Sequence, residues 1–217
     1  GWFGFNPGST MSAGDGKAIA HVLVTTNTAA AVASITSLLT AWALLKKPDL
    51  SMILNGCLAG LVAITAGCAF VSVASSAIIG GIAGVLVVFA VIFFDKLKLD
   101  DPVGALAVHL CNGVFGTLAL GLFYDYDIAS SIAALPPVDA TGAVIAAENW
   151  GRMAQTMVQL KGIVSVGAVV FGISLILWYA IKAVFGGIRV TPEEETEGLD
   201  IGEHGNEAYP DFQAAHK

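Results

Sequence analysis

The sequence predicts an all-α fold, a polytopic membrane bundle of helices, and two features of its composition carry that prediction. Charged residues make up only 12% of the 217 residues, whereas 56% are hydrophobic. Soluble domains carry about 25% charged residues, so this chain has too few charges to cover a water-facing surface. The apolar residues also form blocks of about 18 residues or more, which is the length of a membrane-spanning helix.

The first 13 residues are expected to be the last turns of a helix that begins upstream. The run Gly1-Trp2-Phe3-Gly4-Phe5 is apolar from its first residue and lacks the basic region with which a signal peptide starts. We therefore interpret the chain as a piece of a longer polypeptide.

Two full spans are expected after this partial helix. The first covers residues 17–45 and ends at the polar run Lys46-Lys47-Pro48-Asp49. The second covers residues 51–70. Both limits follow from where polar residues interrupt the apolar blocks.

Three further spans complete the predicted transmembrane domain, residues 1–190. The third covers residues 74–94 and the fourth covers residues 102–123. Asp101 is a suitable N-cap for the fourth span, and Pro102 suits its first helical position, where the missing N–H costs nothing. The fifth span, residues 153–185, is long enough to tilt or to project beyond the bilayer.

Two glycine pairs indicate how these spans pack. Gly56 and Gly60 lie four residues apart in the second span, as Gly80 and Gly84 do in the third. Such pairs let helix backbones approach closely in lipid. The pattern predicts helix packing without identifying the partner helix.

Basic residues predict the orientation of the spans. They follow the first, third and fifth spans, which end on one side of the membrane, and we expect that side to be cytoplasmic. These residues are Lys46, Lys47, Lys96, Lys98, Lys182 and Arg189. The loop of residues 124–152 then lies outside, with Asp125, Asp127, Asp139 and Glu148 against Arg152.

Residues 191–217 form a tail of different composition, which we expect in the cytoplasm. Pro192 is expected to prevent further helix, and four glutamates follow it within residues 193–197. One interpretation is a solvated, mobile tail. The other is a segment that docks on the cytoplasmic face and contacts a regulator.

Several classes of function find no support in the sequence. Cys57, Cys68 and Cys111 lie in apolar blocks without the spacing of a zinc site, and we expect them to pack in helix interiors. The sequence has no nucleophile spaced to meet a base, no phosphate loop and no basic surface for nucleic acid. We therefore expect no enzyme, no nucleic-acid partner, no metal and no cofactor.

His109 is the strongest candidate for a functional residue, because no other histidine lies deep within a span. It lies about 10 Å along the helix from Pro102 at about 1.5 Å per residue. Ionisable groups at such depth usually face an internal path or a partner. Ala105 and Gly113 share its helix face and leave room for a narrow passage, while Asn112 could bond His109 or a neighbouring helix. The alternative is a packed histidine bonded to a backbone carbonyl at a helix–helix contact.

Three aromatic residues, Trp2, Phe3 and Phe5, cluster near the outer end of the partial helix. A tryptophan at that depth often belongs to the interfacial belt. A phenylalanine near an opening can instead gate it, or face a cation with its ring. The residues alone leave both interpretations open.

Three motifs occur in order along the chain. They are Gly1-Trp2-Phe3-Gly4-Phe5-Asn6-Pro7-Gly8-Ser9; Asp100-Asp101-Pro102 with Ala107-Val108-His109 and Gly113; and Gly187-Ile188-Arg189-Val190 with Glu197-Gly198-Leu199-Asp200 and His204-Gly205. Together they resemble the Amt/Mep/Rh ammonium transporter family, specifically its bacterial Amt type. The first is similar to the end of that family's sixth helix, the second to the start of its tenth, and the third to its cytoplasmic tail. The predicted spans would then be helices seven to eleven.

The resemblance implies transport of ammonium or ammonia through a hydrophobic pore with a histidine proton relay. His109 would be the second of the paired pore histidines, and Phe5 one of two stacked phenylalanines that gate the outer mouth. Ser9 would line the outer ammonium site, and Trp2 would line the pore more deeply. Gly104 departs from the family, which often has an acidic residue there, and this weakens the case for an acidic inner vestibule.

The resemblance also implies an inverted-repeat fold of which this chain is the C-terminal half, so the chain alone is not expected to form the pore. It implies a homotrimer in the inner (plasma) membrane, surrounded by lipid, with one pore per subunit and a PII-type signal protein as partner at the cytoplasmic face. Two alternatives stay open. One is an ammonium sensor with the same membrane domain, and the other is a structural membrane subunit with a packed histidine.

Overall fold

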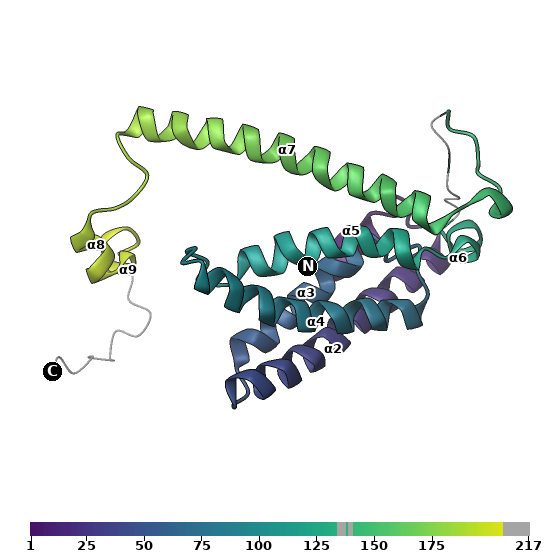
Figure 1. Cartoon of the computed structure of the whole chain (residues 1–217), viewed down its shortest axis with the longest axis horizontal. Helices are drawn as coiled ribbons and strands as arrows, with labels where there is room; N and C mark the ends of the chain where they lie inside the picture. Colours follow the sequence, from purple (N-terminus) through teal and green to yellow (C-terminus); the bar gives the residue numbers. More distant parts are fainter. Residues whose placement is uncertain (134–137, 139–140, 206–217) are drawn as a thin grey trace. The chain divides into compact units, whose positions relative to one another are not determined.

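A computed structural model describes residues 1–133, 138 and 141–205 (Figure 1). The chain divides into two compact units, Gly1–Ser165 and Val166–Lys217, and each is described by itself. Within the described residues the fold is helical, and their β pairing is limited to one isolated bridge between Val138 and Val144. The prediction of an all-α fold is confirmed.

The first unit begins with four helices in chain order. They are α1 (Trp2–Gly8), α2 (Gly16–Leu45), α3 (Leu50–Thr65) and α4 (Val73–Lys96). The side chains of Asp15, Asp49 and Ser72 cap α2, α3 and α4 by accepting a backbone N–H from the first turn of each helix. The partial helix predicted over residues 1–13 ends early, at Gly8.

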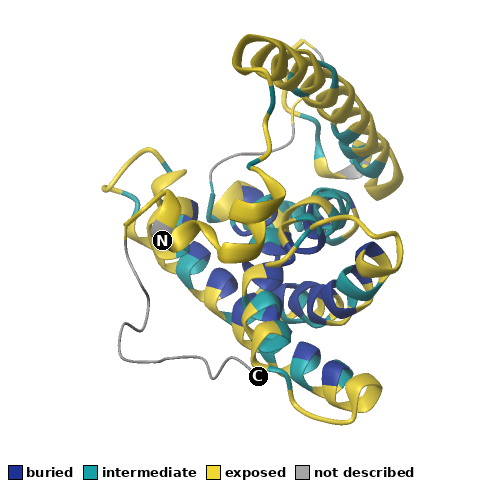
Figure 2. Ribbon diagram, turned by 90° about the vertical axis from the view of Figure 1, so that its left-hand side faces the viewer, coloured by how far each residue is buried: buried dark blue, intermediate teal, exposed yellow. Residues whose placement is uncertain are grey.

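The core of this unit forms where α2 packs against both α3 and α4, and Figure 2 shows the buried residues along their facing sides. Both glycine pairs meet α2. A Cβ atom on Gly60 or Gly80 would overlap the backbone of Ala29, and one on Gly84 would overlap the backbone of Ala33. The predicted helix packing is present, and the structure identifies α2 as the shared partner.

The second predicted span is wrong at its end, because α3 stops at Thr65 instead of residue 70. Groups from other elements take the carbonyl oxygens that a longer helix would use. Thr25 Oγ1 donates to the carbonyl of Cys68 (2.8 Å), the backbone N–H of Asp125 donates to that of Phe70 (2.8 Å), and His21 Nε2 lies 3.0 Å from that of Val71. The chain therefore turns while it is still apolar.

The fourth predicted span also begins differently. Pro102 does not open the helix, because the chain first turns at Gly104, whose φ of +76° is a conformation that favours glycine. Both carboxylate oxygens of Asp101 still act as a cap, and they accept the N–H groups of Ala105 (2.7 Å) and Leu106 (2.9 Å). A π-helix, η1 (Leu106–Cys111), follows and continues into α5 (Asn112–Phe123).

The loop predicted over residues 124–152 contains two short helices, α6 (Tyr126–Ser131) and η2 (Ala147–Asn149). The ring of Tyr124 anchors the loop between Phe70 and Trp150, with ring centroids 5.8 Å and 5.1 Å away. Asp139 lies outside the described residues.

The fifth predicted span is confirmed as α7 (Arg152–Phe185), which has no buried residue (Figure 2). At its start Arg152 Nη1 donates to the carbonyl of Leu122 (2.8 Å). By length and composition, α2, α4, the stretch Leu106–Phe123 and α7 could each cross a membrane, whereas α3 is a shorter apolar helix.

In the second unit, Pro192 opens a helix instead of preventing one. Thr191 and Glu194 form a capping box at the start of α8 (Pro192–Glu197), where a missing N–H is harmless. A second short helix, α9 (Leu199–Gly202), follows. The tail beyond residue 205 lies outside the described residues.

Candidate functional site

Three of the four predicted site residues form a row of aromatic rings. Trp2 stacks on His109 with ring centroids 6.4 Å apart and an interplanar angle of 24°. Phe5 lies on α1 beside Trp2, with ring centroids 5.8 Å apart and a tilt of 54°. We refer to Phe5, Trp2 and His109 as the ring row. The elements α1 and η1, which are far apart in the sequence, therefore meet at these side chains.

Thr65 holds Trp2 in this row. The indole Nε1 donates to Thr65 Oγ1 (2.9 Å), while the Thr65 hydroxyl donates to the carbonyl of Leu61 (2.8 Å). The hydroxyl proton is thus engaged within α3, and the free lone pair of the oxygen faces Trp2. No spacing in the sequence singles out Thr65. The need of a tryptophan N–H for an acceptor in apolar surroundings is the signal that could have identified it.

Asn6 fixes α1 to the bundle, although no pattern in the sequence singles it out. Its side chain is 2% exposed, and Nδ2 donates to Thr26 Oγ1 on α2 (3.0 Å). Asn6 lies next to Phe5 in the chain, so this bond also holds the backbone that carries the exposed Phe5 ring.

Ser9, the fourth predicted site residue, lies apart from the ring row. It is exposed, its hydroxyl donates to the carbonyl of Phe5 (3.1 Å), and it lines a small cavity of about 220 Å³. Asn6, Thr10, Asp15 and Thr65 line the same cavity. Polar side chains, including that of Thr65, which holds Trp2, therefore gather around this smaller cavity.

His109 lies on the exposed side of the π-helix, whereas its neighbours Ala107 and Val108 are buried. It lines a second, larger cavity of about 670 Å³. Asn112 does not bond His109: it is fully buried, and its Nδ2 donates to the carbonyl of Ala107 (2.9 Å). The π-turn brings that carbonyl within reach of the amide, which explains the difference.

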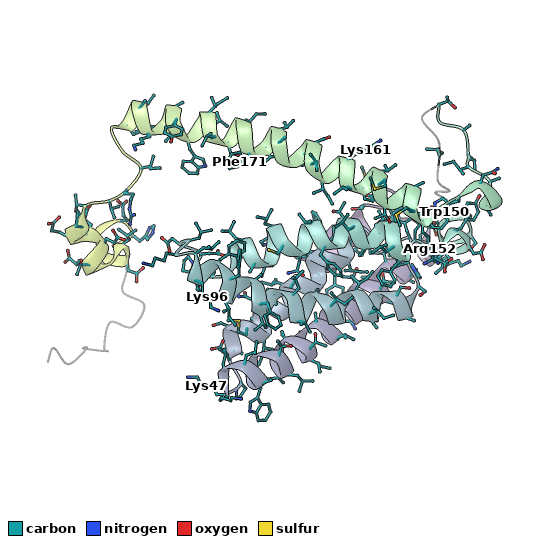
Figure 3. The ribbon with its side chains drawn as sticks, in the orientation of Figure 1. Lys47, Lys96, Trp150, Arg152, Lys161 and Phe171 are labelled. Carbon is teal, nitrogen blue, oxygen red and sulfur yellow. The ribbon has the colours of Figure 1, made fainter. Side chains whose placement is uncertain are left out.

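Carboxylates line the larger cavity even though Gly104 provides none. They are Asp49, Asp95, Asp100 and Asp101. Asp49 and Asp95 are close in sequence to Lys47 and Lys96, and Figure 3 shows both lysines at one end of the first unit, with Trp150 and Arg152 at the other. The cavity thus connects the lysine end of the bundle with His109.

The chemistry of this site is that of aromatic faces, one imidazole and scattered oxygens. Among the described residues, no group of three or more histidines, cysteines and carboxylates is placed to hold a metal ion. An imidazole carries one donor and one acceptor nitrogen when neutral, so its exposed edge can pass a proton between two partners.

Comparisons with known sequences agree with this picture. A sequence model of the Ammonium Transporter Family matches residues 1–209. The chain is 43% identical to the ammonium transporter Amt2 of Archaeoglobus fulgidus over 212 residues, which cover 98% of this chain and 43% of that protein. It is 36% identical to an ammonium transporter of Bacillus subtilis over 214 residues, which cover 97% of this chain and 49% of that protein. The chain thus spans less than half the length of these relatives, which are named as transporters and not as enzymes.

Solved structures give the same result. A protein described as a sensor Amt protein superposes with a TM-score of 0.77 at 36% identity, over 93% of this chain and 45% of its own. Candida albicans Mep2 superposes with a TM-score of 0.74 at 30% identity, over 94% of this chain and 44% of its own.

Proposed function

The chain belongs to the ammonium transporter family of multi-pass membrane proteins, and from this premise we propose that the full-length protein carries ammonium or ammonia across the membrane. The ring row is the single observation that supports the proposal most. An aromatic row that leads from polar oxygens near Ser9 to an exposed imidazole, and from there to an acid-lined cavity, suits the passage of a small nitrogen compound.

The proposed path begins at Phe5 and Ser9. A ring face and a hydroxyl attract a small cation that is losing its water. The bare charge cannot continue, because an unpaired ion in apolar surroundings costs many kcal/mol. Ammonium therefore gives up its proton near the ring row, and neutral ammonia crosses the hydrophobic stretch.

His109 takes the proton in this proposal. Its imidazole accepts at one nitrogen and donates from the other, as a relay requires. Trp2 packs against one face of the ring and leaves its edge open. The carboxylates of the larger cavity then favour recovery of ammonium on the far side, since they attract a cation.

The arrangement in the membrane is part of the same proposal. Residues 1–190 form the transmembrane domain, and residues 191–217 form the tail. The protein lies in the inner (plasma) membrane. Its lysine end faces the cytoplasm, and the tail is also cytoplasmic. Family membership alone supports a homotrimer and a PII-type signal protein at the cytoplasmic face.

A second candidate function is an ammonium sensor. It is favoured by the likeness to the sensor Amt protein, which reaches a TM-score of 0.77. In that case the ring row binds ammonium, and the bound ion changes the state of the tail without sustained transport.

The test uses the full-length protein in liposomes. A transporter gives a steady ammonium-driven current or uptake that scales with the gradient. A sensor gives no flux but an ammonium-dependent change in protease access to the tail. Absence of both responses at saturating ammonium contradicts both candidates.

A further inference from the structure

Asn112 and the π-helix η1 form a unit that the proposed path does not yet explain. Asn112 is fully buried and follows η1 directly. Its Nδ2 donates to the carbonyl oxygen of Ala107 (2.9 Å), five residues earlier. That separation equals the span of a π-helical hydrogen bond, so the side chain bridges the π-turn, while the backbone N–H of Asn112 donates to the carbonyl of His109.

The orientation of the amide is settled by its partner. A carbonyl oxygen only accepts, so the group that faces Ala107 must be the NH₂ of Asn112. Within the described residues, Asn112 Oδ1 is buried without a hydrogen-bond partner. A buried polar atom left unpaired costs free energy. This indicates that the Asn112 amide is buried for the hydrogen bond that its NH₂ group donates.

The two sides of the Trp2–His109 stack are both anchored to α3. Trp2 is anchored through Thr65. His109 is anchored through α5, because a Cβ on Gly116 would overlap the backbone of Ala63, so these two helices touch at that glycine. The stack therefore depends on the register between His109 and Gly116.

The π-turn sets that register. Loss of the one extra residue in the turn would rotate His109 by about 100° relative to Gly116, since an α-helix has 3.6 residues per turn. The imidazole would then leave the face of the helix that contacts Trp2.

We propose that Asn112 is a positioning residue for His109: its amide donor stabilises the π-turn that holds the imidazole against Trp2. The effect of Asn112 on the position of His109 follows from the contacts above, whereas its effect on transport rests on the proposed function. The backbone N–H of Asn112 donates to the carbonyl of His109, but its side chain donates to Ala107 and does not line the larger cavity. The amide therefore acts on the imidazole through the π-turn.

The test compares two variants of different volume in the full-length protein in lipid nanodiscs. Asn112→Leu keeps the approximate size but lacks the donor, and Asn112→Ala lacks both. Thr117→Val is the matched control, because the Thr117 hydroxyl also donates to a backbone carbonyl of the same helix, that of Gly113 (2.8 Å), but outside the π-turn. The readout is the ring-proton NMR shift of His109, assigned by its loss in His109→Ala.

We expect both Asn112 variants to move the His109 signals to the values found in Trp2→Leu, where no indole ring current acts on them. Thr117→Val should leave them unchanged. Unchanged His109 signals in either folded Asn112 variant overturn the proposal, and if one variant does not fold, the other decides.

Transport gives the second readout. Ammonium-driven current should fall about tenfold in the Asn112 variants, the factor expected when a buried hydrogen bond near the upper end of the usual range is lost. If wild-type protein carries no current, the proposed function fails, whereas the NMR result still decides the role of Asn112.

Discussion

At the scale of single residues, hydroxyl and amide groups of residues outside the ring row determine its geometry. Thr65 holds Trp2, and Asn6 ties α1 to Thr26 of α2. Buried polar groups are costly when unpaired, so each bond also disfavours any other position of α1. These hydrogen bonds hold the aromatic side chains in the arrangement in which they contact one another.

Thr65→Val tests this claim for Trp2. The indole N–H loses its acceptor, and we expect a destabilisation of about 1 kcal/mol, the typical value for one such bond. Thermal unfolding in detergent measures the change, and the Trp2 indole N–H signal should move. Thr65→Ser keeps the hydroxyl and serves as the control. Equal melting temperatures and indole signals for Val and wild type would show that the bond does not hold Trp2.

Glu194 gives a pH-dependent prediction in the tail. The backbone N–H of Thr191 first, and its hydroxyl second, lower the pKa of Glu194 below its ordinary value of 4.5. A lowered pKa stabilises the folded capping box at pH above that ordinary value, and this stabilisation is lost as the pH falls through the lowered pKa. Thr191→Ala should therefore raise the pKa of Glu194 toward 4.5.

The side-chain carboxyl ¹³C shift of Glu194 follows this titration. Thr196→Ala is the control, because the Thr196 hydroxyl donates to the carbonyl of Pro192 (2.8 Å) in the same helix without contacting Glu194. A titration curve that is the same in Thr191→Ala and wild type would contradict the capping box.

At the scale of helices, apolar blocks predicted which segments are helical better than where they end. The limits of α2 and α7 follow from polar residues that the sequence shows directly. The end of α3 does not, because Thr25, His21 and Asp125 come from elsewhere in the fold. They bond to carbonyls of residues 68–71, just after the helix. The π-helix around His109 could not be predicted either, because the bond from Asn112 to the carbonyl of Ala107 forms only once the chain has made that turn.

The contact between α2 and α4 gives a prediction at this scale. Gly80→Ala places a methyl group against the backbone of Ala29, and overpacking of this kind costs about 1–3 kcal/mol. The adjacent Gly81→Ala is a matched control, because its new Cβ would lie 3.7 Å from Val32 and 3.9 Å from Thr36, which is ordinary contact. It should be neutral or slightly stabilising, as alanine is the better helix former.

Chemical or thermal unfolding of both variants in the same detergent checks this prediction. A Gly80→Ala protein as stable as Gly81→Ala would mean that α2 and α4 do not approach as closely as described.

At the scale of the whole molecule, composition and the apolar blocks predicted the class of protein, and the motifs predicted its family. The match over residues 1–209 confirms that family. The meeting of Trp2 with His109, 107 positions apart in the printed sequence, was not predictable from spacing, because it depends on how α1 and α5 each lock onto α3. The carboxylates around the larger cavity come from several separate segments, so the sequence alone could not predict that they line the same cavity.

We propose that the exposed imidazole of His109 carries a proton along a path for ammonia. The most direct measurement is ammonium-driven current through the full-length protein with His109→Ala, compared with Leu110→Ala. Leu110 is the adjacent exposed residue of the same π-turn, so its loss leaves the imidazole in place. We expect His109→Ala to abolish the current or to change its dependence on the proton gradient, while Leu110→Ala conducts like wild type. An unchanged current in a folded His109→Ala protein would contradict it.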